Sequence, residues 1–146
     1  MTTIRNARTY DAPALAALCG ELGYPATRRQ LVARLAAIEA QPATRVLVAE
    51  DAAGNVIGWL QVAQSPHLVD DAVMEIVGLV VTAAAQGSGI GAALVRAAEA
   101  WARECGTDRL RVRSRTERER AHAFYLRAGF ERSKTQAVFE KRMTAA

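Results

Sequence analysis

Three glycines alternate along one short segment, at Gly87, Gly89 and Gly91, between an apolar run and a long amphipathic pattern. Glycine has no Cβ, so the backbone can turn tightly there and approach a ligand closely. The first N–H groups of the helix that should follow have no partner inside the helix, and with the helix dipole they favour an anion. The next carboxylate along the chain is Glu99, so no nearby negative charge opposes a phosphate. The pattern therefore predicts a phosphate-binding turn over residues 86–92.

Two nucleotide-binding motifs compete for this turn. A P-loop ends in Gly-Lys-Ser/Thr, whereas Ile90, Gly91 and Ala92 offer neither a lysine nor a hydroxyl. The spacing from Gly87 to Ala92 satisfies the GxGxxG/A pattern of dinucleotide-binding folds, and Asp108 could stand for the acidic residue that this pattern expects. Asp108, however, precedes its strand, and the chain beyond Ala92 is too short for such a fold. NAD and ATP are therefore not expected to bind.

The elements around the turn follow from hydrophobic spacing. Residues 73–81 form the most apolar run, rich in β-branched side chains, and predict a central, buried strand. Residues 89–105 carry apolar side chains at helical spacing. Other helices are expected over residues 11–22, 27–41 and 118–128, and other strands over residues 3–7, 45–50, 56–62, 110–114, 130–134 and 137–143. This order predicts a single α/β (α+β) domain over residues 1–146.

Composition excludes several classes of protein. Of 146 residues, 51% are hydrophobic and 23% are charged, which is typical of a globular domain. The longest apolar stretch, residues 76–85, is too short to span a membrane, and the N-terminus lacks a signal-peptide pattern, so a cytoplasmic protein is expected. Two cysteines and two histidines make a metal site unexpected. The net charge of +4 comes largely from arginines over residues 109–120, but acidic residues interleave with them, and no nucleic-acid motif is present.

Two segments, in this order, resemble the GNAT superfamily of N-acyltransferases. Gln86, Gly89 and Gly91 match the Arg/Gln-x-x-Gly-x-Gly/Ala signature that follows the family's central strand. Residues 121–130, AHAFYLRAGF, match the family's A-x-x-F-Y-x-x-x-G-F ending. The resemblance covers nearly the whole chain. It implies a mixed, mostly antiparallel central sheet of about seven strands, flanked by about four helices.

The same resemblance implies acetyl-CoA as the cofactor. In similar proteins the backbone of the central strand pairs with the pantetheine arm, which would place Leu79, Val80 and Val81 along the cofactor. The N–H groups of the following turn would bind the pyrophosphate, and its residues are Gln86, Gly87, Ser88, Gly89, Ile90, Gly91 and Ala92. Many members carry an asparagine where this chain has Arg118, whose side chain could still reach a phosphate.

Acetyl transfer to an amine needs a base for the amine proton, a donor for the oxyanion and an acid for the departing thiolate. Tyr125 matches the tyrosine that often lies near the cofactor sulfur in similar proteins, and its phenol would serve as the acid; otherwise it is a core aromatic residue. Glu75 matches a glutamate that acts as base in some similar enzymes. It could equally be a strand-end carboxylate that faces water or pairs with an arginine. Asp70, Asp71, Glu21 or a water chain could replace it.

The acceptor should enter over the first two helices, from the loops at residues 20–27 and 64–71. Glu21, Tyr24 and Asp70 lie there and could favour a cationic amine. The expected function is direct transfer, in a ternary complex, of an acetyl group from acetyl-CoA to a primary amine of a small molecule or peptide. A homodimer is conceivable, since similar proteins are often dimers. The alternative is a regulatory module that binds acetyl-CoA without turnover.

Overall fold

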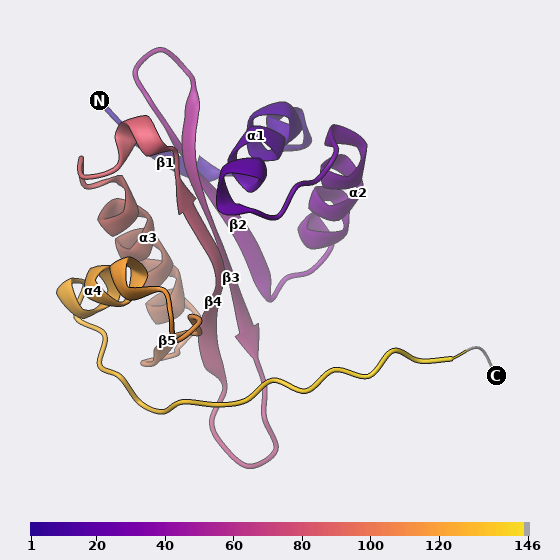
Figure 1. Ribbon diagram of the computed structural model, residues 1–146, viewed down its shortest axis with the longest axis vertical. Coiled ribbons are helices and arrows are strands. Elements are labelled where there is room, and N and C mark those ends of the chain that lie inside the picture. Colours follow the sequence, from indigo (N-terminus) through magenta and orange to yellow (C-terminus); the bar gives the residue numbers. More distant parts are fainter. Residues whose placement is uncertain (145–146) are drawn as a thin grey trace. The chain divides into compact units, whose positions relative to one another are not determined.

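The computed structural model describes residues 1–144. The chain divides into two compact units, Met1–Arg113 and the segment that begins at Ser114, and each is described by itself. The first unit holds the sheet and three of the helices, and the second holds the last helix (Figure 1).

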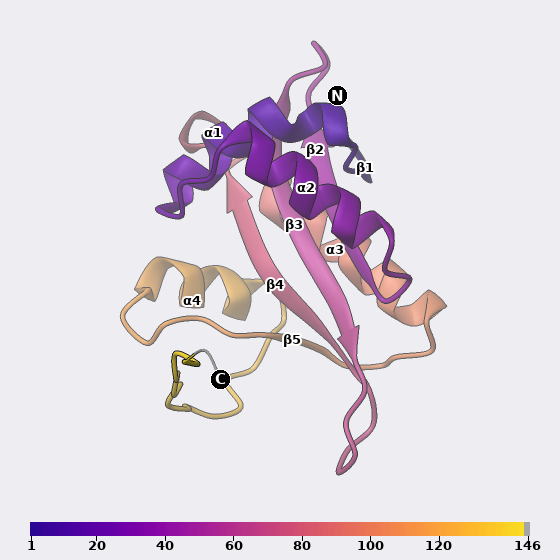
Figure 2. The same ribbon diagram turned by 90° about the vertical axis from the view of Figure 1, so that its right-hand side faces the viewer.

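The first unit is built on a five-stranded sheet in the order β1-β2-β3-β4-β5 (Figures 1 and 2). The strands are β1 (Thr3–Asn6), β2 (Thr44–Glu50), β3 (Val56–Ser65), β4 (Val73–Val81) and β5 (Leu110–Val112). The first four pair antiparallel and β5 pairs parallel to β4, which gives the mixed, mostly antiparallel sheet that was expected. Strand β4 has the bounds that its apolar run predicts.

Helices cover both faces of this sheet. Helices α1 (Ala12–Leu22) and α2 (Arg28–Glu39) lie on one face, and α3 (Ile90–Glu104) lies on the other. Thr27 caps α2 as expected: its hydroxyl accepts a hydrogen bond from the Gln30 N–H, and the Gln30 side chain accepts one from the Thr27 N–H. The sheet and α3 together hold the candidate site, so its scaffold has a packed layer on each side.

Apolar side chains fill the two layers between the helices and the sheet. Leu15, Leu31 and Leu35 pack with Val48 on the α1–α2 side. On the other side, α3 buries a stripe of six residues, Ile90, Leu94, Val95, Ala98, Trp101 and Ala102. Burial of each large apolar side chain contributes about 1.5–3 kcal/mol, so these two layers fix the sheet to its helices.

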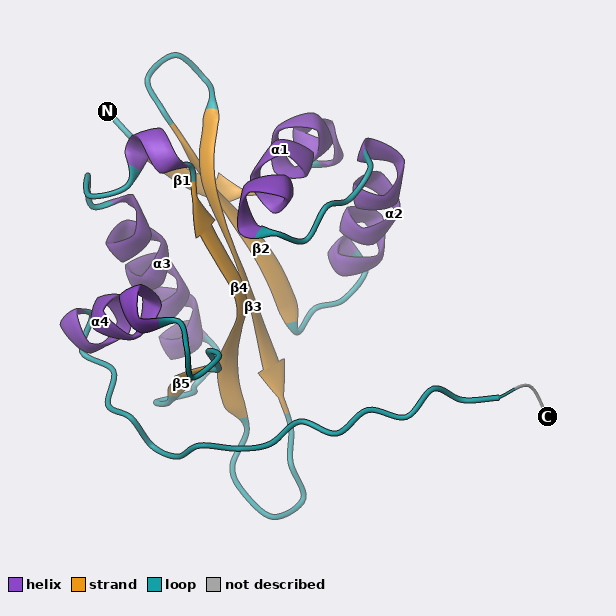
Figure 3. Cartoon of the chain, viewed as in Figure 1, coloured by secondary structure: helices purple, strands orange, loops and turns teal. Residues whose placement is uncertain are grey.

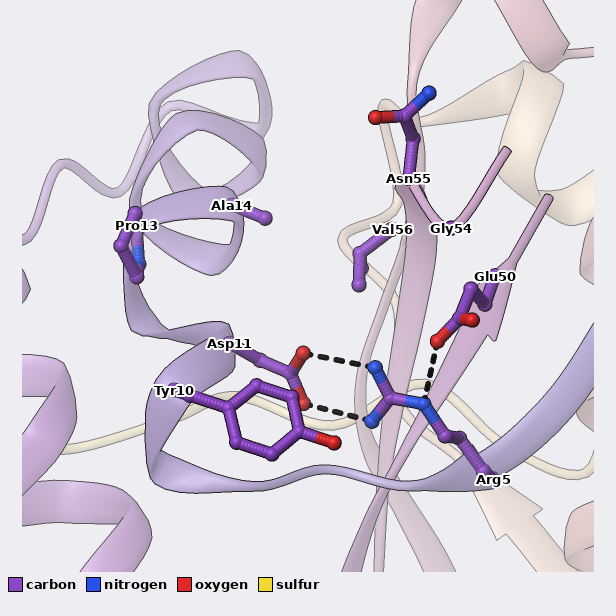
Figure 4. A pocket seen from close by; sticks show the side chains of 9 residues that line it. All are labelled: Arg5, Tyr10, Asp11, Pro13, Ala14, Glu50, Gly54, Asn55 and Val56. Atoms are coloured by element: carbon purple, nitrogen blue, oxygen red, sulfur yellow. Dashed lines mark hydrogen bonds and ion pairs between the residues drawn. The ribbon is translucent and has the colours of Figure 1, made fainter. Parts of the chain in front are cut away.

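A buried ion pair joins β1 to the start of α1. The Asp11 side chain is 4% exposed, and its two oxygens accept hydrogen bonds from the Arg5 guanidinium at 2.9 Å each (Figure 4). Burial acts to raise the pKa of Asp11, but hydrogen bonds from Arg5 and from the Arg8 N–H outweigh it, so the pKa lies below its usual value. Arg5 also donates to Glu50 on β2. Asp11 was expected to cap α1; its carboxylate instead ties the chain entering α1 to the sheet.

The second unit contains α4 (Glu119–Arg127), which ends before Gly129 at a φ of +95°. The two strands expected over residues 130–134 and 137–143 do not form, so the sheet within residues 1–144 has five strands and not about seven (Figure 3). A strand is stable only when its backbone pairs with a neighbouring strand, which an apolar pattern does not guarantee. Val138 and Phe139 are 79% and 91% exposed in this segment, so their pattern produces no buried face.

The four predicted helices are all present, and the first three flank the sheet of the first unit. None of the helices within residues 1–144 combines the length and apolar character that a membrane span requires.

Candidate active site

Strand β4 contains a β-bulge that the sequence analysis did not single out. In its pairing with β3, Gln61 lies opposite Gly78 and Val62 lies opposite Ile76, so Val77 is left without a partner. The Val77 side chain is 57% exposed. A Cβ on Gly78 would lie 2.7 Å from the Trp59 ring, so the indole packs against bare backbone beside the bulge. An isolated glycine within a strand pattern is the signal that could have found this feature.

The second half of β4 has one unpaired edge within the first unit. Strand β5 pairs with β4 only from Met74 to Ile76. Beyond the bulge, no strand of residues 1–113 pairs with the β5 side of Leu79–Val81, while β3 pairs with the opposite side. The backbone N–H and C=O groups that point to this edge can therefore bind an extended ligand by strand-like hydrogen bonds. Leu79, Val80 and Val81 are the residues expected to pair with a pantetheine arm.

The glycine turn follows this edge in the chain after the short 3-10 helix η2 (Ala83–Ala85). Gly87 and Gly89 have φ angles of +83° and +86°, and a Cβ built on either meets no atom within 4 Å. Gly89 is the N-cap of α3, and no acidic side chain lies in the first turn of that helix. The first helical hydrogen bond donated is that of the Ala93 N–H to the Gly89 carbonyl, so the preceding N–H groups have no partner inside the helix. The turn thus has open space and free donors where a phosphate was predicted.

Side chains of the turn brace its own backbone. Gln86 Nε2 donates to the Val81 carbonyl at 3.1 Å, and the Ser88 hydroxyl donates to the Ala85 carbonyl. The Ile90 side chain belongs to the buried stripe of α3, so this residue can reach a ligand only through its backbone. Gly91 and Ala92 lie in the first turn of α3 and are half-buried.

The acidic residues expected near the acceptor do not converge. Glu21, in the last turn of α1, accepts hydrogen bonds from Thr82, just beyond the C-terminal end of β4. Asp70 precedes the N-terminal end of β4 and pairs with Arg109 at 2.8 Å, a hydrogen bond that lowers its pKa. Nine residues of strand, about 30 Å, separate the two ends. Tyr24 follows α1, close to Glu21 in the sequence. Its side chain is 58% exposed and is therefore open to a ligand.

Glu75, the expected base, is held by an arginine. Its Oε1 accepts a hydrogen bond from Arg113 Nε at 2.9 Å, and its side chain is 23% exposed. This is the pairing that the sequence left open as the alternative to catalysis. The second carboxylate oxygen, Oε2, makes no hydrogen bond within residues 1–144. Glu75 can therefore accept a proton only at that oxygen without breaking its ion pair.

In the second unit, Tyr125 lies in an aromatic cluster on α4. Its ring packs edge-to-face on Phe124 and Phe130, with centroids 5.3 and 5.6 Å apart. Burial raises the pKa of Tyr125 above its usual value, and the positive charge of Arg118, the N-cap residue of α4, only partly offsets this. A phenol in this state stays protonated over the physiological range and can act as an acid.

Comparisons with known proteins resolve the class of protein. The sequence profile of the Acetyltransferase (GNAT) family matches residues 13–130. The chain is a member of the GNAT acetyltransferase family. It is 33% identical over 141 residues to the aminoglycoside N(6')-acetyltransferase type 1 of Stenotrophomonas maltophilia, an alignment that covers 94% of this chain and 91% of that protein.

Solved structures show the same GNAT fold. A transcriptional regulator from Bacillus halodurans C-125 superposes with a TM-score of 0.87 at 24% identity, over 97% of this chain and 100% of that one. The aminoglycoside N-acetyltransferase AAC(6')-Iy, in complex with CoA, superposes with a TM-score of 0.86 at 17% identity, over 98% and 96% of the two chains. The resemblance that the two motifs carry is confirmed.

As a GNAT acetyltransferase, the protein is an acetyl-CoA-dependent N-acetyltransferase, which confirms the expected cofactor and enzyme class. The site of the first unit suits this cofactor on two counts. The unpaired edge of β4 offers amide groups to an extended arm, and the turn from Gly87 to Gly89 leaves room that any side chain would fill. CoA supplies both chemical features, an amide-bearing arm and a pyrophosphate.

Proposed function

We propose that this GNAT enzyme transfers an acetyl group from acetyl-CoA directly to a primary amine of a small molecule or peptide, in a ternary complex. The observation that carries the proposal is the unpaired edge of β4, followed after the short helix η2 by the glycine turn at the start of α3. An arm laid along Leu79–Val81 leads straight to the N–H groups before Ala93. The acetyl end of the cofactor then lies toward the bulge at Val77.

The cofactor contacts follow from this direction. The backbone of Leu79–Val81 pairs with the pantetheine amides, except for the Val81 carbonyl, which accepts from Gln86. The N–H groups of residues 86–92 hold the pyrophosphate. Arg118, which starts α4, is proposed to bind a phosphate group by charge. Because the side chain of Ile90 is buried, the turn acts through its backbone, and the cofactor is selected by shape and charge.

The chemistry needs one proton to leave the amine and one to reach the sulfur. The neutral amine nitrogen attacks the thioester carbonyl carbon, and the carbon–sulfur bond breaks as the amide forms. Tyr125 is proposed to donate its phenolic proton to the departing thiolate. Glu75 Oε2, or a water that it holds, is proposed to take the proton from the amine, while Oε1 remains paired with Arg113.

The acceptor is proposed to be a cationic amine. Tyr24 is an exposed aromatic ring just beyond α1, and the Glu21 carboxylate beside the C-terminal end of β4 has only neutral donors as partners within residues 1–144. Asp70, at the other end of β4, has its charge paired with Arg109 and is the weaker candidate for the acceptor. The relative from Stenotrophomonas maltophilia is an aminoglycoside acetyltransferase. Aminoglycosides are therefore the first acceptors to test here. A homodimer is also proposed, and the mass of the protein in solution tests it.

An acceptor screen tests the function. Purified protein is mixed with acetyl-CoA and with aminoglycosides, polyamines, amino acids or peptides, and free thiol release is followed. The proposal is supported if the wild type turns over an amine and if Tyr125→Phe does so more slowly. Saturable CoA binding with no turnover on any amine would favour the alternative, a module that binds acetyl-CoA for regulation. Absence of CoA binding would refute both.

A further inference from the structure

One carboxylate joins the end of α1 to the segment that leads into the glycine turn. Glu21 accepts hydrogen bonds from the Thr82 hydroxyl, at 3.2 Å to Oε1 and 3.0 Å to Oε2. Its Oε1 also accepts one from the Ala83 N–H at 3.0 Å. These partners are 61 and 62 residues away in the sequence. The contact therefore joins two elements that no local pattern connects.

The contact falls where the chain leaves the sheet. Thr82 is the N-cap residue of a short 3-10 helix, η2 (Ala83–Ala85), and its own side chain caps nothing there. Glu21 supplies the missing acceptor from another helix, so the Ala83 N–H has a charged partner. Helix α1 ends beside the tip of β4 (Figure 2), where this bond forms.

The turn beyond this point is held in steps. Glu21 fixes the start of η2, and the hydroxyl of Ser88 donates back to the Ala85 carbonyl at its end. Gly89 follows and begins α3. The side chains of Glu21, Gln86 and Ser88 thus brace the segment between β4 and the phosphate-binding N–H groups. A turn braced before the ligand arrives spends more of its time in the conformation that binds, which lowers the apparent Kd.

We propose that Glu21 is a positioning residue for the cofactor: it acts through Thr82 and Ala83 and pre-organises the turn that holds the pyrophosphate. This rests on the proposed use of that turn for acetyl-CoA. It also gives Glu21 a role that differs from binding the acceptor amine. A positioning role predicts a change in cofactor affinity with no acceptor present, whereas an acceptor contact predicts a change in acceptor KM alone.

Calorimetric titration of CoA into the free protein tests this role. Glu21→Ala removes the acceptor of all three hydrogen bonds, so the Kd for CoA should rise about three- to tenfold. Thr82→Val removes one donor and should shift the Kd in the same direction by less. The double variant should be no weaker than Glu21→Ala, because both changes break one contact. Glu39→Ala, an exposed carboxylate on α2, removes the same charge and should leave the Kd unchanged.

A second readout separates this role from the proposed function. Amide hydrogen exchange at Ala83, Ala85 and Gln86, whose N–H groups are hydrogen-bonded, should be faster in Glu21→Ala than in the wild type, with no ligand present. Glu21→Gln, whose amide oxygen still accepts, should restore part of the protection. If the wild type fails to bind CoA, the proposed function falls, and exchange alone decides whether Glu21 braces the turn.

Two results would overturn the inference. One is a wild-type Kd for CoA in Glu21→Ala, whether or not the acceptor KM rises. The other is unchanged amide exchange at Ala83, Ala85 and Gln86. If Glu21→Ala does not fold, Thr82→Val carries the same measurements, and an unaltered Kd and unaltered exchange in that variant would overturn it equally.

Discussion

Replacing Gly89 with alanine adds one methyl group where the backbone has a φ of +86°. Apart from its neighbours in the chain, no atom of residues 1–144 lies within 4 Å of a Cβ there, so the substitution causes no internal clash. Its cost is the left-handed conformation, about 1–2 kcal/mol for a residue with a side chain. The other end of α3 offers a matched control, because Gly106 has a φ of +75° and the same open surroundings. The two glycines are separated by about 22 Å of helix.

The structure predicts equal strain at the two glycines but different consequences for the ligand. Gly89→Ala and Gly106→Ala should each lower the free energy of unfolding by about 1–2 kcal/mol. In Gly89→Ala the turn must also be returned to its binding conformation, so the Kd for CoA should rise about 5- to 30-fold. Gly89→Val adds bulk in the space where the pyrophosphate should lie, and should abolish binding altogether. Gly106→Ala should bind CoA as the wild type does.

Calorimetry with CoA and thermal unfolding of the three variants measure these effects. Wild-type CoA affinity in Gly89→Val would refute the assignment of the turn to the pyrophosphate. An equal loss of affinity in Gly106→Ala would show that general stability, and not the turn, controls binding.

Other predictions address the catalytic groups and the ion pair. Tyr125→Phe should lower kcat by about 10²–10⁴-fold with little change in the Kd for CoA, and unaltered turnover would remove the acid role. Because burial raises the pKa of Tyr125, the activity that depends on its proton should persist to higher pH than a free phenol allows, as a pH–rate profile can show. Glu75→Gln should slow turnover, and high pH should partly restore it because the amine then loses its proton without a base. A wild-type pH profile in this variant would show that Glu75 serves only as the ion-pair partner of Arg113. The pKa of Asp11 is lowered in the folded state, so its ionised carboxylate stabilises the protein at any pH above the unfolded pKa, about 3.9. This stabilisation should be lost as the pH falls from there through the lower folded-state pKa. Urea unfolding across pH should show this loss in the wild type and not in Asp11→Asn. Arg5→Met leaves Asp11 buried without its charged partner and should lower the free energy of unfolding by up to about 3–5 kcal/mol.

The sequence by itself determined the parts of this protein that depend on neighbouring residues. The apolar run predicted β4 with its observed bounds, and the amphipathic pattern predicted α3 to within a residue at each end. Gly87 and Gly89 predicted a turn, because only glycine adopts those φ angles without strain. Thr27 predicted the start of α2, because a threonine side chain can cap the first turn of a helix. Side-chain shape and backbone sterics act over a few residues, so a short window is enough to find these features.

Tertiary structure decided the features that join distant residues. The bulge at Val77 exists only in the register of β4 against β3, although Gly78 gave a local hint of it. The pairing of Glu75 with Arg113 turned an open choice between base and ion pair into a specific geometry. Glu21 looked like an acceptor contact because of its loop, and its bond to Thr82 became visible only when α1 lay beside the end of β4.

The missing C-terminal strands have the same cause. Residues 130–134 and 137–143 have strand-like composition, but a ladder of hydrogen bonds needs a partner strand as well as a suitable segment. Local pattern specifies what a segment can become, and pairing across tens of residues selects among those forms. In this protein the local rules specify the glycine turn, whereas its bracing by Glu21, the bulge in β4 and the partners of the acidic residues arise only when the chain folds.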